Sequence, residues 1–224
     1  MVGRLFLSGG GDEKQTYKID EEFLRGVEKI LYIPIAWKDG DYESCKRWFS
    51  NAMGMHKKVH ITTLTELSNA PSLEDYDAVY VGGGNTFKLL DEMKRFNFDD
   101  KLHKYFLNGG TVYGGSAGAI IWGNDINIAL YCEDADENKV NLKDTKGINV
   151  VSNCDVQCHF FDNQEKEHLD YVDENNRNVV ALPEESALLI SKDGSKVIGD
   201  KPVTLFTRGK IKKFEVGENF NMSY

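Results

Sequence analysis

The most informative part of the sequence is the stretch Thr111-Val112-Tyr113-Gly114-Gly115-Ser116-Ala117-Gly118-Ala119-Ile120-Ile121-Trp122. Its first three residues have the β-branched and aromatic character of a short strand, and its last four form an apolar run that suits a buried helix. Between them, small residues surround a single serine. This order predicts a strand that turns sharply into a helix, with the hydroxyl of Ser116 held at the turn.

The sequence before this stretch alternates between predicted strands and predicted helices. Short apolar runs indicate the strands, and the segments between them place apolar residues at helical spacing. Such alternation predicts a mostly parallel sheet that is covered by helices on both faces. The strands are predicted at residues 2–7, 30–35, 59–64 and 78–81.

The last third of the chain has a different pattern. Residues 187–198 and 203–216 each contain two apolar runs joined by a turn, Asp193-Gly194 in the first and Arg208-Gly209 in the second. Two strands joined by so short a turn form an antiparallel hairpin. We therefore expect one α/β domain over residues 1–224, with C-terminal antiparallel hairpins that extend the sheet.

Composition restricts the class of protein. Hydrophobic residues make up 41% of the 224 residues and charged residues 28%, which is typical of a soluble globular protein. The net charge of −9 repels phosphate backbones, so we expect no nucleic acid partner. No apolar run is long enough to cross a bilayer, and the first residues lack the pattern of a signal peptide. We expect no membrane partner, a cytoplasmic location and a monomer or homodimer.

The turn at Ser116 fits G-x-S-x-G, the nucleophile elbow. A nucleophile on so sharp a turn needs an unusual backbone conformation, and small neighbours avoid clashes there. The helix that follows directs its free N–H groups at a developing oxyanion. A glycine-rich turn with an incidental serine is the alternative, since the pattern is short. The strand before the turn and the apolar run after it favour catalysis.

A serine nucleophile needs a base, and His159 is the best candidate among the five histidines. It follows an apolar segment that reads as a strand, and active sites form at strand ends in parallel sheets. His103 and His168 lie in charged, helix-like stretches and are expected in solvent, while His56 and His60 are expected on the surface.

An acid must orient the base, and the sequence leaves two places for it. One place lies between Ser116 and His159, which follows the chain order of α/β-hydrolases. The other is Glu184, which follows the strand-like residues 179–182. Chain order does not decide between them, because a triad is defined by geometry. The candidates of the first kind are Asp125, Glu133, Asp134, Asp136, Glu137, Asp144 and Asp155.

No metal or cofactor is expected. Cys154, Cys158 and His159 come nearest to a zinc site, but their spacing is unsuitable, and adjacent residues of a strand point to opposite faces. The loop after the first strand lacks G-x-G-x-x-G, because Lys14 stands where the last glycine would. The four cysteines form no C-x-x-C pair, and we expect reduced thiols.

Four motifs together resemble the dipeptidase E family of serine peptidases, which includes aspartyl dipeptidases and cyanophycinases. The resemblance covers the whole chain in order and at similar spacing. The motifs are Val81-Gly82-Gly83-Gly84-Asn85-Thr86-Phe87, Ser116-Ala117-Gly118-Ala119, His159-Phe160 and Leu182-Pro183-Glu184.

This resemblance implies a three-layer α/β fold and the cleavage of short peptides through an acyl-enzyme. It implies a triad of Ser116 as nucleophile, His159 as base and Glu184 as the orienting acid. It also implies an oxyanion hole and substrate contacts. The oxyanion residues would be Gly84 and Ala117, and the substrate-binding residues Gly83, Asn85 and Thr86. The alternatives are an esterase or amidase with the same triad, and a non-catalytic protein whose glycine loops bind a small ligand.

The chain departs from aspartyl dipeptidases in its charges. Those enzymes carry arginines around the pocket for the substrate carboxylate, whereas residues 117–138 contain no lysine or arginine, and residues 161–176 contain only Lys166. A carboxylate in a partly buried pocket without a paired cation costs several kcal/mol. We therefore predict that the enzyme does not require Asp in its substrate. The distant cations that folding could bring to the site are Lys14, Lys38, Arg47 and Arg177.

Overall fold

The computed structural model describes residues 2–37, 40–131, 135–151 and 153–220. Among the residues discussed above, Lys38, Cys132, Glu133 and Asp134 lie outside these ranges. An eight-stranded sheet forms the centre of the molecule, in the order β12-β9-β8-β1-β5-β4-β2-β3. Its strands are β1 (Arg4–Ser8), β2 (Lys29–Ile33), β3 (His60–Thr63), β4 (Ala78–Val81), β5 (Thr111–Gly115), β8 (Ser186–Ser191), β9 (Gly194–Gly199) and β12 (Asn219–Phe220).

The first five strands of the chain pair in parallel, as the strand and helix alternation predicts. β4 and β5 are buried along their whole length, because helices cover both faces of the sheet. The predicted hairpin near residue 193 is also present. Its strand β8 lies antiparallel to β1, and β9 lies antiparallel to β8, so this hairpin extends the sheet.

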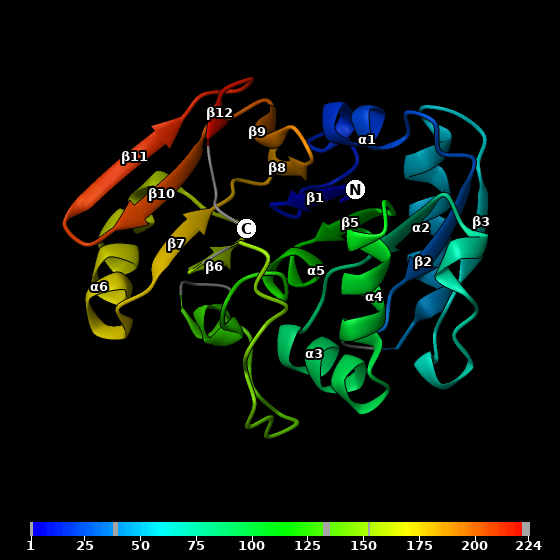
Figure 1. Ribbon diagram of the computed structural model, residues 1–224, viewed down its shortest axis with the longest axis horizontal. Helices are drawn as coiled ribbons and strands as arrows, with labels where there is room; N and C mark the ends of the chain where they lie inside the picture. Colours follow the sequence, from blue (N-terminus) through cyan, green and yellow to red (C-terminus); the bar gives the residue numbers. More distant parts are fainter. Residues whose placement is uncertain (1, 38–39, 132–134, 152, 221–224) are drawn as a thin grey trace.

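Two hydrophobic clusters pack on opposite faces of this sheet. On one face, Phe6 and Tyr80 pack with α1 (Tyr17–Phe23) and α2 (Tyr42–Gly54). On the other, Leu7 and Val81 pack with α3 (Thr86–Arg95), α4 (Phe98–Leu107) and α5 (Ala117–Ile120). Figure 1 shows α1 on one side of β1, and α3 and α4 on the other. Successive residues of a strand point to opposite faces of the sheet, so each strand contributes to both clusters. Helices on both faces of the sheet give the predicted three layers.

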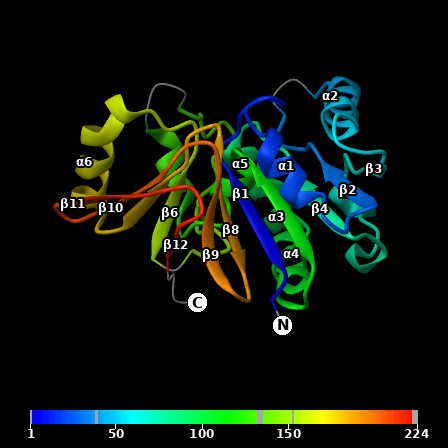
Figure 2. The same ribbon diagram turned by 90° about the horizontal axis from the view of Figure 1, so that it is seen from above.

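A second sheet was not expected from the sequence. Four strands, β6 (Cys154–Gln157), β7 (Asn178–Ala181), β10 (Val203–Thr207) and β11 (Lys210–Phe214), pair in the order β11-β10-β7-β6. The predicted hairpin at residues 203–216 therefore forms, but it continues this second sheet, because β10 pairs with β7. Figure 2 shows β12, β9 and β8 between β1 and the second sheet.

Helix α6 (Glu165–Asn175) packs against the second sheet and contradicts one expectation. His168 lies on α6 and is only 1% exposed, with its ring stacked on Phe206 at 4.9 Å between centroids. Its Nδ1 lies 2.8 Å from the carbonyl oxygen of Gln164. The expectation that His168 is solvated is wrong, because the apolar side of α6 faces β10.

Short 3₁₀ helices complete the described chain at Leu67–Asn69, Leu73–Asp75, Ile126–Leu130 and Asp162–Gln164. Within the described ranges, no helix has the length and apolar character that a membrane crossing requires.

Candidate active site

The candidate site lies where the two sheets meet. Ser116 follows β5 of the large sheet, whereas His159 and Glu184 follow β6 and β7 of the second sheet. Two backbone hydrogen bonds hold the junction at the end of β1. The amide of Ser116 donates to the carbonyl of Ser8 at 3.1 Å, and the amide of His159 donates to that of Gly9 at 3.0 Å. The nucleophile and base candidates are therefore both fixed to one strand end.

The three side chains of the predicted triad form a continuous chain of hydrogen bonds. Ser116 Oγ lies 2.9 Å from His159 Nε2, and His159 Nδ1 lies 2.8 Å from Glu184 Oε1. The second oxygen of Glu184 accepts from Gln15 Nε2 at 2.7 Å. Gln15 is in turn held by the amide of Asp12, which donates to its Oε1 at 2.8 Å. Each member of the chain thus has a fixed orientation.

Two of these residues have an unusual backbone. Ser116 has φ 52° and ψ −116°, and His159 has φ 54°. Positive φ in a residue with a side chain costs about 1–3 kcal/mol and is concentrated at functional sites. The helix after Ser116 also approaches the sheet closely. A Cβ on Gly118 would lie 2.3 Å from the carbonyl oxygen of Val81, so the small residue predicted by the elbow pattern is required there.

Gly10 lies beside the contact between the serine and the histidine. A Cβ at this position would lie 2.7 Å from Cε1 of His159 and 2.8 Å from Cβ of Ser116. Its φ of +96° also disfavours any residue with a side chain. The loop after β1 therefore leaves room for the Ser116 and His159 side chains only because residue 10 is glycine.

The predicted oxyanion residues flank Ser116. Ala117 is the first residue of α5, so its N–H has no carbonyl one turn earlier to accept it. Gly83 and Gly84 follow β4, the neighbour of β5, and line the same cavity as Ser116. Amides in this arrangement can stabilise negative charge that develops on a substrate oxygen.

The side chains of Asn85 and Thr86 bind within the protein. Thr86 donates from its amide and its hydroxyl to Oδ2 of Asp136, at 2.8 and 2.7 Å. Asn85 caps α3 by accepting from the amide of Lys88, and its Nδ2 lies 3.2 Å from Oδ1 of Asp136. These bonds hold the loop that carries Gly83 and Gly84. Contact of Asn85 and Thr86 with a substrate stays a prediction.

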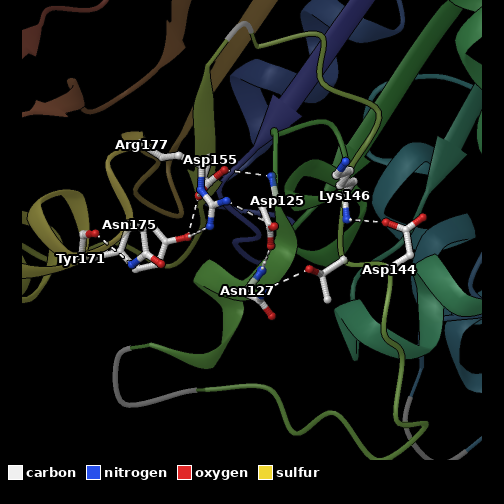
Figure 3. A network of polar contacts seen from close by, with 9 residues as sticks. Asp125, Asn127, Asp144, Lys146, Asp155, Tyr171, Asn175 and Arg177 are labelled. Atoms are coloured by element: carbon white, nitrogen blue, oxygen red, sulfur yellow. Dashed lines mark hydrogen bonds and ion pairs between the residues drawn. The ribbon is translucent and has the colours of Figure 1, made fainter.

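Asp125 and Asp155, two other acids that could have oriented His159, lie in a polar network apart from the triad, which Figure 3 shows. Asp155 Oδ2 accepts from the Tyr171 hydroxyl at 2.6 Å and from Arg177 Nε at 2.9 Å. Arg177 Nη1 also lies 3.3 Å from Asp125 Oδ2. Burial raises the pKa of Asp155, which is fully enclosed. The position of Arg177 in this network removes it from the list of cations available to the cavity.

Three other acids that could have oriented His159 form ion pairs away from it. Glu137 pairs with Lys139, Asp144 with Lys94, and Glu185, the neighbour of Glu184, with Lys201. Among the acids considered that lie in the described ranges, Glu184 is the one bonded to His159.

A cavity of about 780 Å³ opens beside Ser116 and reaches His159 and Glu184. Its walls contain residues that the sequence reasoning did not connect with the site, above all Tyr32, Trp37 and Tyr80. Trp48, on α2, also lines it. The signal that could have found Trp37 and Tyr80 is their position just after or at the end of predicted strands, where active sites form.

Cys158 and His159, two of the three residues that come nearest to a zinc site in the sequence, make separate contacts in the structure. Cys158 is buried, with its Sγ 3.5 Å from the carbonyl oxygens of Ser8 and Ser116, while the His159 ring contacts the Ser116 hydroxyl. Burial raises the pKa of the Cys158 thiol. In the part of the chain that the structure describes, no group of three or more His, Cys, Asp or Glu residues could hold a metal ion.

Comparison with known proteins places this geometry in context. Residues 5–198 match the profile of peptidase family S51. Peptidase E of Haemophilus influenzae is 24% identical over 204 residues, covering 86% of this chain and 84% of that protein. Peptidase E of Nostoc is 27% identical over 198 residues, covering 84% and 79%. The crystal structure of a peptidase from an acI-B1 Actinobacterium superposes with a TM-score of 0.76 at 19% identity, covering 99% and 97% of the two chains, and shows the fold alone.

Proposed function

The chain belongs to peptidase family S51, a family of serine peptidases, and from this premise we propose that it cleaves short peptides with Ser116, His159 and Glu184 as its catalytic triad. The observation that carries the proposal is the hydrogen-bonded chain from Ser116 Oγ through His159 to Glu184, which opens on a cavity. Ser116 and Glu184 come from different sheets, so their alignment is a property of the whole fold.

In the first step, Ser116 Oγ attacks the scissile carbonyl carbon, and His159 Nε2 takes the hydroxyl proton. Glu184 accepts a hydrogen bond from Nδ1–H, which leaves Nε2 free to act as the base. The carbonyl oxygen gains negative charge, and the amides of Gly84 and Ala117 stabilise it. Gln15 keeps the Glu184 carboxylate in place.

His159 then gives its proton to the leaving amine, the peptide C–N bond breaks, and the acyl group stays on Ser116 as an ester. Water attacks this ester while His159 takes a proton from the water. The bond between the acyl carbon and Ser116 Oγ breaks, His159 returns the proton to Oγ, and the acid product leaves. The triad and the amides supply proton transfer and charge stabilisation, so we expect turnover to continue in the presence of a metal chelator.

An esterase or amidase with the same triad is the alternative function. Paired substrates with the same acyl group, one a peptide and one a non-peptide ester or amide, discriminate between the two. Higher kcat/KM on the peptide, after correction for the intrinsic reactivity of each bond, favours the peptidase.

Replacement of the nucleophile tests the proposal. Ser116→Ala removes one oxygen and is expected to lower turnover of the best peptide by about 10⁶. The melting temperature should stay close to that of the original protein, because Ala fits the same space. Ser50→Ala, at an exposed position on α2, is the matched control and should leave turnover unchanged. Turnover of Ser116→Ala near that of the control would refute the role of Ser116.

A further inference from the structure

One side of the cavity is built from four aromatic side chains. Tyr32 lies on β2, Tyr80 on β4, Trp37 a few residues after β2, and Trp48 on α2. We name these four side chains the aromatic wall. Trp37 and Trp48 are 43% and 40% exposed, whereas Trp122 in the core is 0% exposed. Two indole rings at the mouth of a cavity offer a large apolar surface to a ligand.

The aromatic wall is held in place by the protein. Tyr32 stacks on Phe49 with centroids 4.1 Å apart, and Tyr80 stacks on Tyr113 at 4.3 Å. Trp48 Nε1 donates to Glu13 Oε2 at 3.2 Å, which ties α2 to the loop after β1. A wall fixed in this way loses little conformational freedom when a side chain packs on it.

The wall adjoins the loops that carry the proposed chemistry. The amide of Asn85, next to Gly84, donates to the carbonyl of Ala36 at 2.8 Å, which places Trp37 beside the oxyanion loop. Burial raises the pKa of Tyr80, so its phenol stays neutral. The wall is therefore uncharged and directly adjacent to the reacting serine.

The charges around the cavity disfavour an anionic side chain. Among the described residues, its lining includes no lysine or arginine. Its acids are Glu184, bonded to His159 and Gln15, and Asp136, bonded to Thr86. A substrate carboxylate here would lose water without gaining a cation, and it would lie near two negative groups.

The order of the strands locates the wall relative to the scissile bond. β5, which leads into Ser116, has β1 on one side and β4, then β2, on the other. His159 binds the backbone after β1, so it lies on the first side. Because His159 protonates the leaving amine, the leaving group departs on that side. The aromatic wall, on β2, β4 and α2, lies on the side of the acyl group.

We propose that the aromatic wall binds an uncharged apolar side chain, preferably aromatic, on the substrate residue that supplies the scissile carbonyl. This inference rests on the proposed function and names its substrate class. A cavity of about 780 Å³ is within the usual size of small-ligand sites and has room for a dipeptide with one aromatic side chain.

A panel of dipeptides with a constant second residue tests the proposal. We would measure kcat/KM for Phe-Leu, Ala-Leu and Asp-Leu, and in parallel the hydrolysis of p-nitrophenyl acetate, which has no side chain to bind. The expected preference for Phe-Leu over Ala-Leu is about 30-fold, from the burial of one aromatic side chain. Asp-Leu should be no better than Ala-Leu.

Two variants then assign the preference to the wall. Trp48→Ala should reduce the Phe-Leu to Ala-Leu ratio by about tenfold, because it removes a stacking surface. Phe96→Ala, which changes an exposed aromatic residue outside this cavity, should leave the ratio unchanged. A ratio that falls equally in both variants would overturn the assignment to the wall.

The outcomes separate this inference from the proposed function. Hydrolysis of p-nitrophenyl acetate together with a flat panel, or with an Asp-Leu preference of about 100-fold, would overturn the inference alone. Failure to hydrolyse both the acetate ester and every peptide would overturn the proposed function, and the inference with it.

Discussion

Two clusters of polar side chains flank β6, and they differ in one respect that matters for function. In the first, Ser116, His159 and Glu184 are hydrogen bonded in a row, and the row opens on a cavity. In the second, Asp155 lies on β6 itself, is 0% exposed, and is bonded to Arg177 and Tyr171.

The difference in exposure explains why we propose a catalytic role for Glu184 and a structural role for Asp155. Glu184 and His159 keep 27% and 32% of their side chains exposed, so a substrate can reach the row. The Asp155 carboxylate is satisfied by the hydroxyl of Tyr171, the guanidinium of Arg177 and the amide of Asp125. A carboxylate enclosed by such donors holds elements together and has no free face for chemistry.

Replacing the carboxylate by an amide should mainly affect turnover in the first cluster and mainly affect stability in the second. Glu184→Gln leaves His159 without its orienting carboxylate and is expected to lower turnover by about 10⁴, with little change in melting temperature. Asp155→Asn leaves Arg177 less well paired and is expected to lower the free energy of unfolding by about 3 kcal/mol. Its turnover per folded molecule should stay within a few-fold of the original.

Turnover and denaturant unfolding of both variants measure this contrast, with Glu185→Gln as a control for Glu184→Gln, since Glu185 pairs with Lys201 at the surface. A loss of turnover in Asp155→Asn as large as that in Glu184→Gln would mean that the two clusters do not have separate roles.

A third acid, Asp20, sharpens the comparison, because it is buried and has no ion pair among the described residues. Asp20 is 2% exposed, and one of its oxygens accepts from the Thr16 hydroxyl at 2.8 Å. Burial raises the pKa of Asp20 to about 7. Between about pH 4 and pH 7, folded Asp20 holds a proton that the unfolded chain has lost, so its contribution to stability falls as the pH rises through this range.

Asp20→Asn should remove this part of the pH dependence. The free energy of unfolding of the original protein, relative to that of the variant, should fall by up to about 4 kcal/mol between pH 4 and pH 8. Chemical denaturation at several pH values measures the difference. Parallel pH profiles for the two proteins would show that Asp20 does not titrate in this range.

The smallest expected effect concerns Gln15, whose side chain donates a hydrogen bond to Glu184 of the proposed triad. Gln15→Met keeps the size of the side chain and removes the hydrogen bond to Glu184 Oε2. Loss of such a supporting bond typically costs about 10- to 100-fold, so we expect kcat to fall by about tenfold with KM nearly unchanged. Asn69→Met, which changes an exposed amide outside the cavity lining, is the control. Equal effects on kcat and KM, or no effect, would contradict a positioning role.

The local features of the site could be predicted from the sequence. The strand, elbow and helix around Ser116 depend on neighbours in the chain, so the residue pattern indicates them directly. His159 could be proposed because it follows an apolar run. Glu184 was assigned from the family resemblance, since the residue pattern alone left several acids as possible partners of His159.

Features that depend on distant contacts could not be predicted. Gln15 and Glu184 are separated by 169 residues, and no local pattern links them. The turn residues predict the hairpin at residues 203–216, but they do not show which strand the hairpin pairs with. His168 looks polar by its neighbours, and only the packing of α6 on β10 shows that it is buried.

Covalent labelling with a fluorophosphonate tests whether Ser116 is the nucleophile. The reagent forms a stable phosphonyl ester on a serine that an adjacent base activates, and intact mass followed by peptide mapping finds the modified residue. We predict one adduct, on Ser116, that is absent in Ser116→Ala and forms orders of magnitude more slowly in His159→Ala. Peptide hydrolysis that persists while Ser116 stays unmodified, or a stoichiometric adduct on another residue, would show that Ser116 is not the nucleophile.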